Sequence, residues 1–335
     1  MSAGRLALVG CYTTQGAPGL QSVRVRPGGD LEPLDVLAME SPSCVVWHPS
    51  LPVAYATNET AEGGITAVVV DDAGGLRPLG TAPTGGSPCH AAVTADGRWL
   101  LTADYTGGSV SLVELGPDGT PHARVDTLAM VGSGPVADRQ EQAHPHMIAT
   151  DVLGGLLICV DLGSDRLTSL AISDRGELRT EHTWRLPPGT GPRQIVTHPD
   201  GATALVLGEL SATLLQVGLG DADEAVVLAE VPSTTRAERA LPAQLTVHDD
   251  LVLVSNRGPD TVAVFDPGTP ALAQVAEVPT GGRWPRHFAV ADGLLLVSDE
   301  DSSTIETLEL GADYELGRRL SRFATSAPTW VALQP

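Results

Sequence analysis

Short apolar runs separated by glycine, proline and aspartate follow one another along the whole chain. Valine, leucine and isoleucine dominate these runs, for example at residues 65–70, 156–160 and 251–254. Runs of this length with turn residues at both ends are typical of β-strands, and the 3.6-residue apolar period of a helix is almost absent. The pattern predicts an all-β protein built from many short strands.

A longer repeat is superimposed on the strands. Prolines begin similar units at intervals of about 43 to 57 residues, and these are Pro42, Pro88, Pro145, Pro192, Pro242, Pro285 and Pro328. After each of the first six, two predicted strands lead to a pair of residues: Asn58-Glu59, Asp104-Tyr105, Asp161-Leu162, Gly208-Glu209, Asn256-Arg257 and Asp299-Glu300. Asp96-Gly97, Asp200-Gly201 and Asp292-Gly293 stand midway, where a tight hairpin turn belongs. A second set of turns after the pairs completes units of about four strands.

Seven such units predict a seven-bladed β-propeller of four-stranded blades. The unit that starts at Pro328 has only one strand, at residues 329–333, so its partners must come from residues 6–11 and beyond. We therefore expect the N- and C-terminal strands to share one blade and close the ring, which removes open sheet edges. An open β-solenoid is the alternative, although its repeats are usually shorter. We expect residues 1–335 to form one domain, with 132–142 and 218–224 as surface loops.

The composition disfavours several classes of partner. The chain is 42% hydrophobic and carries a net charge of −21, and all 20 of its basic residues are arginine. This balance disfavours a nucleic-acid partner, and a basic helix on a membrane surface is excluded. No apolar run is long enough to cross a bilayer. The first residues lack a signal peptide's apolar stretch, and four widely spaced cysteines suggest reduced thiols, so we expect a cytoplasmic protein.

Equivalent positions of a circular repeat form rings around its axis, where a site can lie. The residues after the prolines form one ring: Ser43, Cys89, His146, Arg193, Ala243, Arg286 and Thr329. The pairs form a second, with Glu59, Tyr105, Asp161, Glu209, Arg257 and Glu300. Polar residues at strand ends often only cap loops. However, these positions diverge into histidine, arginine and carboxylate, as expected of a site on a repeated scaffold, and arginine forks bind carboxylate or phosphate.

Other chemistry is weakly represented. His144 and His146 could supply two metal ligands, but no further ligands stand at metal-binding spacing. We therefore expect no metal and no cofactor. We place His144 instead among the substrate-binding residues, together with Glu59, Tyr105, Asp161 and Arg286.

Several motifs carry a family resemblance. They are Asn58-Glu59, Tyr105 with Gly107-Gly108, Arg139-Gln140 through His144-Pro145-His146, Asp161-Leu162-Gly163 with Asp165, Gly191-Pro192-Arg193, Gly208-Glu209-Leu210, Asn256-Arg257-Gly258 and Pro285-Arg286. In this order, along almost the whole chain, they resemble the seven-bladed β-propeller lactonases. That family includes propeller-type 6-phosphogluconolactonases and fungal carboxy-muconate lactonizing enzymes. The chain departs from the usual pattern at Gln194, where histidine is common, and at Gln244, where an acidic residue is common.

The resemblance implies roles for four residues. By motif, the histidine, two arginines and glutamate implicated in the muconate-cyclizing members look like His146, Arg193, Arg257 and Glu209. We expect hydrolysis of a sugar lactone such as 6-phosphogluconolactone, with His146 titrating near neutrality and activating water while the arginines stabilise the oxyanion.

Two other functions stay open on the sequence. A cycloisomerase would clamp the carboxylates of a muconate with the same arginines, and a non-catalytic propeller would only bind a ligand or protein. Under any of these hypotheses we expect a small anionic lactone or carboxylate as ligand, no nucleic-acid or membrane partner, and a monomer or weak homodimer.

Overall fold

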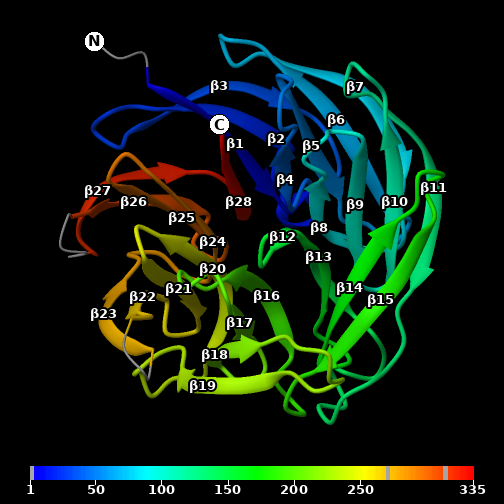
Figure 1. Cartoon of the computed structure of the whole chain (residues 1–335). Helices are drawn as coiled ribbons and strands as arrows, with labels where there is room; N and C mark the ends of the chain where they lie inside the picture. The colour runs from blue at the N-terminus through cyan, green and yellow to red at the C-terminus, as the bar shows by residue number, and fades with distance from the viewer. Residues whose placement is uncertain (1–3, 269–271, 312–315) are drawn as a thin grey trace.

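The computed structural model describes residues 4–268, 272–311 and 316–335, and these form seven four-stranded antiparallel sheets arranged in a ring (Figure 1). The first three blades are β28 (Pro328–Leu333), β1 (Arg5–Cys11), β2 (Leu20–Val25) and β3 (Leu31–Leu37); β4 (Val45–Trp47), β5 (Val53–Asn58), β6 (Gly64–Val70) and β7 (Leu76–Pro83); and β8 (Pro88–Val93), β9 (Trp99–Asp104), β10 (Ser109–Leu115) and β11 (Pro121–Ala129).

The chain continues around the ring in the same order. The other four blades are β12 (Pro145–Val152), β13 (Leu156–Asp161), β14 (Arg166–Ile172) and β15 (Leu178–Arg185); β16 (Pro192–Thr197), β17 (Ala204–Gly208), β18 (Thr213–Gly218) and β19 (Val226–Pro232); β20 (Leu241–His248), β21 (Leu251–Arg257), β22 (Thr261–Asp266) and β23 (Ala273–Pro279); and β24 (Pro285–Ala291), β25 (Leu294–Asp299), β26 (Thr304–Leu310) and β27 (Leu316–Ala324). The one helix in the described chain is a 3₁₀ turn, η1 (Thr13–Gln15).

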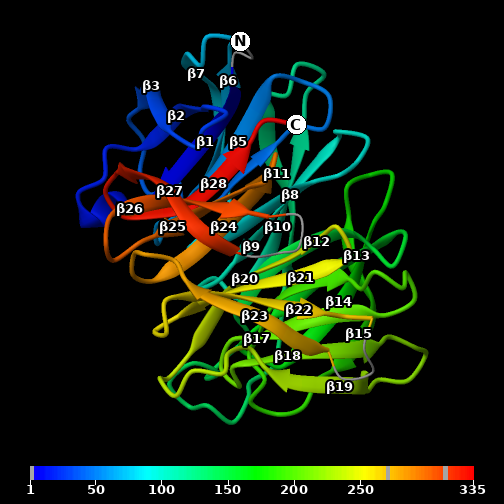
Figure 2. The same ribbon diagram turned by 90° about the vertical axis from the view of Figure 1, so that its left-hand side faces the viewer.

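The predicted closure of the ring is confirmed. β28 is the innermost strand of the blade that β1, β2 and β3 complete, and it pairs antiparallel with β1, placing Ala7 opposite Leu333 and Val9 opposite Val331. The strands nearest the two chain ends therefore lie side by side, as both views show (Figure 2). The sequence expectation of a seven-bladed propeller with a shared blade was correct.

The hairpins follow from the turn residues. Asp292 and Gly293, between β24 and β25, have φ values of 53° and 73°, the positive pair that a type I′ turn needs. Gly97, between β8 and β9, also has a positive φ, and a Cβ there would lie 2.6 Å from the His48 ring. Glycine at this turn therefore lets neighbouring blades approach closely.

The core is divided among the blade interfaces. Seven clusters of buried apolar side chains lie between neighbouring blades, one at each interface of the described chain. The cluster between the β16 and β20 blades, for example, joins Leu207 and Leu214 to Val254 and Phe265, all with no exposed surface. Because apolar burial is spread around the ring, the axis is left to the polar side chains of the inner strands.

Candidate active site at the mouth of the propeller

In four blades, a β-bulge changes the direction of the side chain that follows the first proline of the inner strand. The pairing register shifts directly after the proline between Pro88 and His90, Pro145 and Met147, Pro192 and Gln194, and Pro285 and His287. The skipped residues are Cys89, His146, Arg193 and Arg286. A bulged residue leaves the ladder and turns its side chain out of the regular alternation. All four line one small cavity of about 20 Å³ with Ser43 and Thr329, so six of the seven residues of the predicted first ring meet there; Ala243 does not line the cavity.

Glu209 is the centre of the polar cluster at this mouth. It directly follows β17 and is 2% exposed. Its Oε2 accepts a hydrogen bond from Arg193 at 2.7 Å and forms an ion pair with Arg257 at 2.9 Å, and its Oε1 accepts a hydrogen bond from Arg139 at 2.8 Å. Burial alone would raise the pKa of Glu209, but the arginines outweigh it and hold this pKa well below its ordinary value. The carboxylate is therefore ionised and fixes three guanidinium groups in one place.

His146 is held by the same cluster. Its Nε2 accepts a hydrogen bond from Arg193 Nη1 at 2.5 Å, and Arg193 Nε donates to the Ala243 carbonyl at 2.7 Å. Burial, and then the charge of Arg193, hold the pKa of His146 well below its ordinary value. The expectation that His146 titrates near neutrality is therefore wrong, because a desolvated imidazole beside a guanidinium stays neutral.

A second polar group lies on the other side of the mouth. Arg286 donates to the Tyr12 hydroxyl at 2.5 Å, and Tyr12 donates to the Glu59 carboxylate at 3.0 Å. Arg286 also lies 3.4 Å from Glu300. Glu59 is only partly exposed, and burial raises its pKa even though Arg286 opposes this. This carboxylate therefore attracts protons more strongly than an ordinary glutamate does.

Known proteins resemble this chain along nearly its whole length. A family model described as lactonase, 7-bladed β-propeller, matches residues 6–333. The chain belongs to this family. A 6-phosphogluconolactonase of Bacillus subtilis is 30% identical over 327 residues, which is 93% of each chain. Among solved structures, a candidate 6-phosphogluconolactonase from Bacteroides uniformis superposes with a TM-score of 0.90 at 26% identity, covering 98% of this chain and 99% of the other.

Other solved structures support the fold of this lactonase-family chain. A candidate 6-phosphogluconolactonase from Bacteroides fragilis has a TM-score of 0.90 at 24% identity and covers 100% of this chain and 99% of its own. The periplasmic gluconolactonase of Pseudomonas aeruginosa has a TM-score of 0.89 at 22% identity, with 98% of each chain covered. The seven-bladed ring therefore extends over the full length of these proteins as well.

The two members of each repeat pair have different places in this lactonase fold. In the ladders, the first members Asp104, Asp161, Asn256 and Asp299 lie opposite Pro88, Pro145, Pro242 and Pro285. Asp161 is 1% exposed, and its carboxylate accepts the backbone N–H groups of His144 and Gly163 and the Ser164 hydroxyl. We therefore correct Asp161 from a substrate-binding to a structural residue. Glu59 is the second member of its pair, so its counterpart in this blade is Leu162 and not Asp161. Adjacent strand residues point to opposite faces, which is why the first and second members have different surroundings.

His144 contacts Tyr105, a residue of the predicted second ring. Its ring stacks on Tyr105 with centroids 4.5 Å apart, Nδ1 bonds to the Tyr105 carbonyl at 2.8 Å, and Nε2 lies 2.9 Å from Glu141. Since the ring is 5% exposed, it fixes Tyr105 rather than facing the mouth. The edge of His146 packs against the same Tyr105 ring.

Arg139 belongs to one of the family motifs, but the sequence pattern assigned it no role at the site. It lies in the 132–142 segment, which we expected to be only a surface loop, and it reaches Glu209 and the Tyr105 hydroxyl, the latter at 3.4 Å. Its neighbour Gln140 is fully buried and donates to the Leu162 carbonyl and to Asp165, both at 2.8 Å. The sequence signal for this residue was the family motif Arg139-Gln140, which lies in a unit longer than the others.

The two departures from the family pattern lie next to each other. Gln194 Nε2 donates to Gln244 Oε1 at 2.9 Å, and Gln194 Oε1 accepts the Leu245 N–H at 2.5 Å. Both line the 20 Å³ cavity. The two amides satisfy each other, so the change in residue type leaves a neutral, fully bonded contact between neighbouring inner strands.

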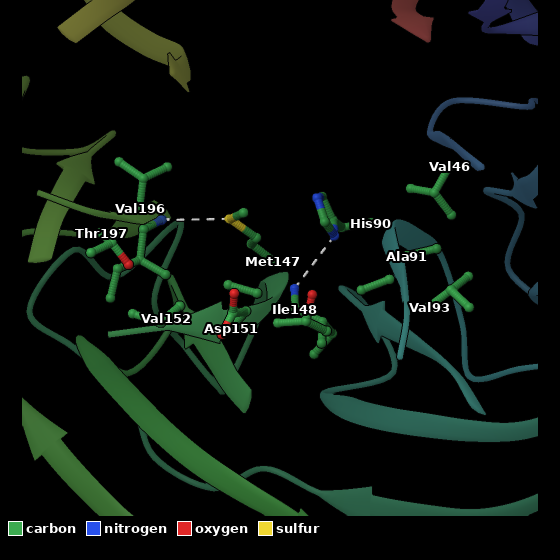
Figure 3. A pocket seen from close by; sticks show the side chains of 14 residues that line it. Val46, His90, Ala91, Val93, Met147, Ile148, Asp151, Val152, Val196 and Thr197 are labelled. Carbon is green, nitrogen blue, oxygen red and sulfur yellow. Dashed lines mark hydrogen bonds between the residues drawn. The ribbon is translucent and has the colours of Figure 1, made fainter. Parts of the chain in front are cut away.

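The far ends of the inner strands form a different pocket of about 420 Å³ (Figure 3). Val46, Met147 and Val196 line it, and Asp151 is its one carboxylate. His90 contributes a ring whose pKa burial lowers to about 4, so it is neutral. Such a lining offers an anion no positive charge, whereas the opposite mouth gathers four arginines.

Residues 4–268, 272–311 and 316–335 contain no group of three histidine, cysteine or carboxylate side chains placed to hold a metal ion. In the same ranges no helix is long and apolar enough to span a bilayer. All four cysteines are free thiols.

Proposed function

We propose that this protein hydrolyses a negatively charged sugar lactone such as 6-phosphogluconolactone. The observation that carries the proposal is the cluster of Arg139, Arg193, Arg257 and Arg286 at one mouth of a chain with a net charge of −21. Glu59, Glu209 and Glu300 neutralise only part of it, so an anionic substrate meets a local surplus of positive charge. Membership of the lactonase family and the 30% identity to a 6-phosphogluconolactonase support the same substrate class.

The arginines would act on the developing charge. In the reaction, water adds to the lactone carbonyl, the ring C–O bond breaks, and a carboxylate and a hydroxyl are formed with release of one proton. The tetrahedral intermediate carries an oxyanion, for which a fixed guanidinium is a suitable donor. Arg139, whose side chain is 32% exposed, is the most accessible arginine that Glu209 holds, and we place the substrate against it.

Glu59 is the better base in this geometry. The lone pair of His146 Nε2 is occupied by Arg193, and its low pKa makes the imidazole a weak base. Glu59 is partly exposed, and its raised pKa brings it closer to the working pH, where general base catalysis is most efficient. We therefore assign Glu59 the role of water activation that the sequence had suggested for His146, and give His146 the role of holding Arg193.

Acid release from a panel of lactones tests the proposal. Purified protein should release acid from 6-phosphogluconolactone, and Glu59→Gln should lower kcat about 10²–10⁴-fold, which is the usual contribution of a general base. Glu62→Gln is the matched control, because Glu62 is exposed in the same loop. A loss confined to His146→Ala would return the base role to His146.

Two outcomes oppose the proposed reaction itself. Loss of diene absorbance from a muconate without acid release from any lactone would make the protein a cycloisomerase that uses the same arginines. Tight binding of a sugar lactone with no turnover of either substrate class would make it a binding module.

A further inference from the structure

We propose that the axial cavity beneath the arginine cluster binds a single monatomic anion, for which chloride is the available cellular species. The cavity measures about 20 Å³, which is room for one water-sized atom or molecule. Ligand pockets for small organic molecules are more than tenfold larger. The cavity is therefore a binding place distinct from that of the lactone, and the inference does not depend on which reaction the mouth catalyses.

The cavity lining favours an anion over a cation. Arg193 and Arg286 contribute guanidinium groups, and no carboxylate lines the cavity. The amide oxygens of Gln194 and Gln244, the most obvious acceptors, are both occupied by N–H donors of neighbouring strands. A lining with charged donors and no free carboxylate attracts negative charge and repels positive charge.

One buried donor in the lining has no partner. Arginine can only donate, so the hydrogen bond from Arg193 makes Nε2 of the neutral His146 ring an acceptor and leaves the ring proton on Nδ1. His146 is 8% exposed, and its Nδ1 has no hydrogen-bond partner among the described residues. Buried N–H groups normally have an acceptor, and an anion in this cavity would supply one.

The charge balance points the same way. At the mouth above the cavity stand four arginines, Arg139, Arg193, Arg257 and Arg286, and three glutamates, Glu59, Glu209 and Glu300; of these, only Arg193 and Arg286 line the cavity itself. At least one positive charge is left over even when every glutamate is ionised. A bound anion would neutralise it inside the ring, where water screens charges poorly.

Thermal unfolding of the full chain tests the proposal. The midpoint should rise with chloride concentration by a few degrees in a saturable manner, because a ligand that binds only the folded state stabilises it. Bromide should do the same. Methanesulfonate at matched ionic strength and pH should not, because it is too large for the cavity. Equal midpoints in chloride and methanesulfonate would overturn the proposal and leave water as the partner of His146.

A pair of variants localises the effect. His146→Phe keeps a ring but removes the Nδ1 donor, so its midpoint should lose the chloride-dependent rise. His198→Phe is the matched control: His198 is 6% exposed in the β16–β17 hairpin, and its Nε2 also has no partner among the described residues. This variant should keep the rise. An equal loss in both variants contradicts a site at the axis.

Bromide in crystals of the unmodified protein gives a second measurement that requires no variant. Anomalous scattering should place one bromide within hydrogen-bonding reach of His146 Nδ1 on the propeller axis. Bromide found only at the molecular surface, with no axial peak, would refute the site even if the unfolding midpoint depends on chloride.

Discussion

Glu209 is the residue on which the arrangement of the mouth depends. Its two oxygens form ion pairs with three arginines, so the carboxylate both neutralises and positions them. Removal of one partner from a buried charged group leaves the others uncompensated. The folded-state pKa of Glu209 is depressed. Its contribution to stability is therefore present above the unfolded pKa and is lost as the pH falls through the folded pKa.

We expect Glu209→Gln to destabilise the protein by about 3–5 kcal/mol, because the amide keeps the shape of the side chain but leaves three guanidinium groups without an anion. Urea unfolding at pH 7 measures the change. Glu238→Gln, at an exposed position, should change stability by less than about 0.5 kcal/mol. Equal midpoints for the two variants would contradict the central role of Glu209.

Asp299 gives a second prediction at this scale. Its Oδ1 accepts the Thr280 hydroxyl, its Oδ2 has no hydrogen-bond partner among the described residues, and it has no exposed surface. Burial raises the pKa of Asp299 from 3.8 to about 8. A raised folded-state pKa contributes stability that is fully present below pH 3.8 and is lost as the pH rises through about 8.

The free energy of unfolding should therefore fall between about pH 4 and 8, and Asp299→Asn should flatten that decline, because the amide has no proton to lose. Chemical unfolding at several pH values measures the slope. An unchanged slope in the variant would mean that another group causes the decline. The two proteins should be closest in stability below pH 3.8, where the aspartate is protonated in both the folded and the unfolded state.

At the scale of elements, the 132–142 loop shows how a connection can complete a site. Gln140 is its anchor, since its buried amide joins the loop to the end of β13 and to Asp165. Because Gln140 anchors the loop, the adjacent Arg139 is held at the mouth, while the rest of the loop is largely exposed. The loop therefore positions a guanidinium that no strand supplies.

We expect Gln140→Ala to lower kcat/KM for the lactone by up to about 10²-fold, which is the effect of a displaced positioning group. The cost in stability should be about 1–3 kcal/mol, since two buried acceptors lose their donor. Gln142→Ala is the control: this exposed side chain in the same loop makes one 3.3 Å contact to the Thr106 carbonyl. Faster hydrogen exchange at residues 132–142 in the Gln140 variant alone would localise the effect, whereas unchanged kcat/KM would contradict it.

The sequence predicted the elements better than the facing of individual side chains. Prolines begin all seven units, paired residues follow in the first six, and turn residues separate the strands, so the hairpins and most of the first ring followed from them. The sequence did not show which member of a residue pair faces the mouth. A strand places adjacent residues on opposite faces, and the bulge after the proline changes this alternation. Asp161 was misplaced for this reason. Arg139 lies in a family motif but was given no role at the site, because its loop has no counterpart in other units. The low pKa of His146 depends on burial that spacing does not show.

For the whole molecule, stability depends on closing the ring. β28 completes the inner edge of the first blade by pairing with β1, and Val331 belongs to the apolar cluster between that blade and the β24 blade. An unclosed ring would expose both a strand edge and the faces of two blades. The covalent order of the strands matters less, because the two end strands are already neighbours.

Two changes separate closure from connectivity. A chain ending at Ala327 lacks β28 and should lose cooperative unfolding, since an inner strand and part of two core clusters disappear. A circular permutant, with the old ends joined and new ends at the exposed Gly154-Gly155 turn, should keep a midpoint within a few degrees of the parent. Thermal unfolding measures both, and a shortened chain that melts like the parent would contradict the need for closure.

Closure by β28 also sets an order of events during synthesis. β1 pairs early with β2, but its inner partner, β28, is made after the 26 other strands. At about 5–20 residues per second, the inner edge of β1 therefore stays unpaired for roughly tens of seconds. Tyr12 and Glu300, which meet the same Arg286, also come from opposite ends of the growing chain. The anion-binding mouth is thus among the last features to mature, and a nascent polypeptide stalled before β28 would present chaperones with a sheet edge that the finished protein never shows.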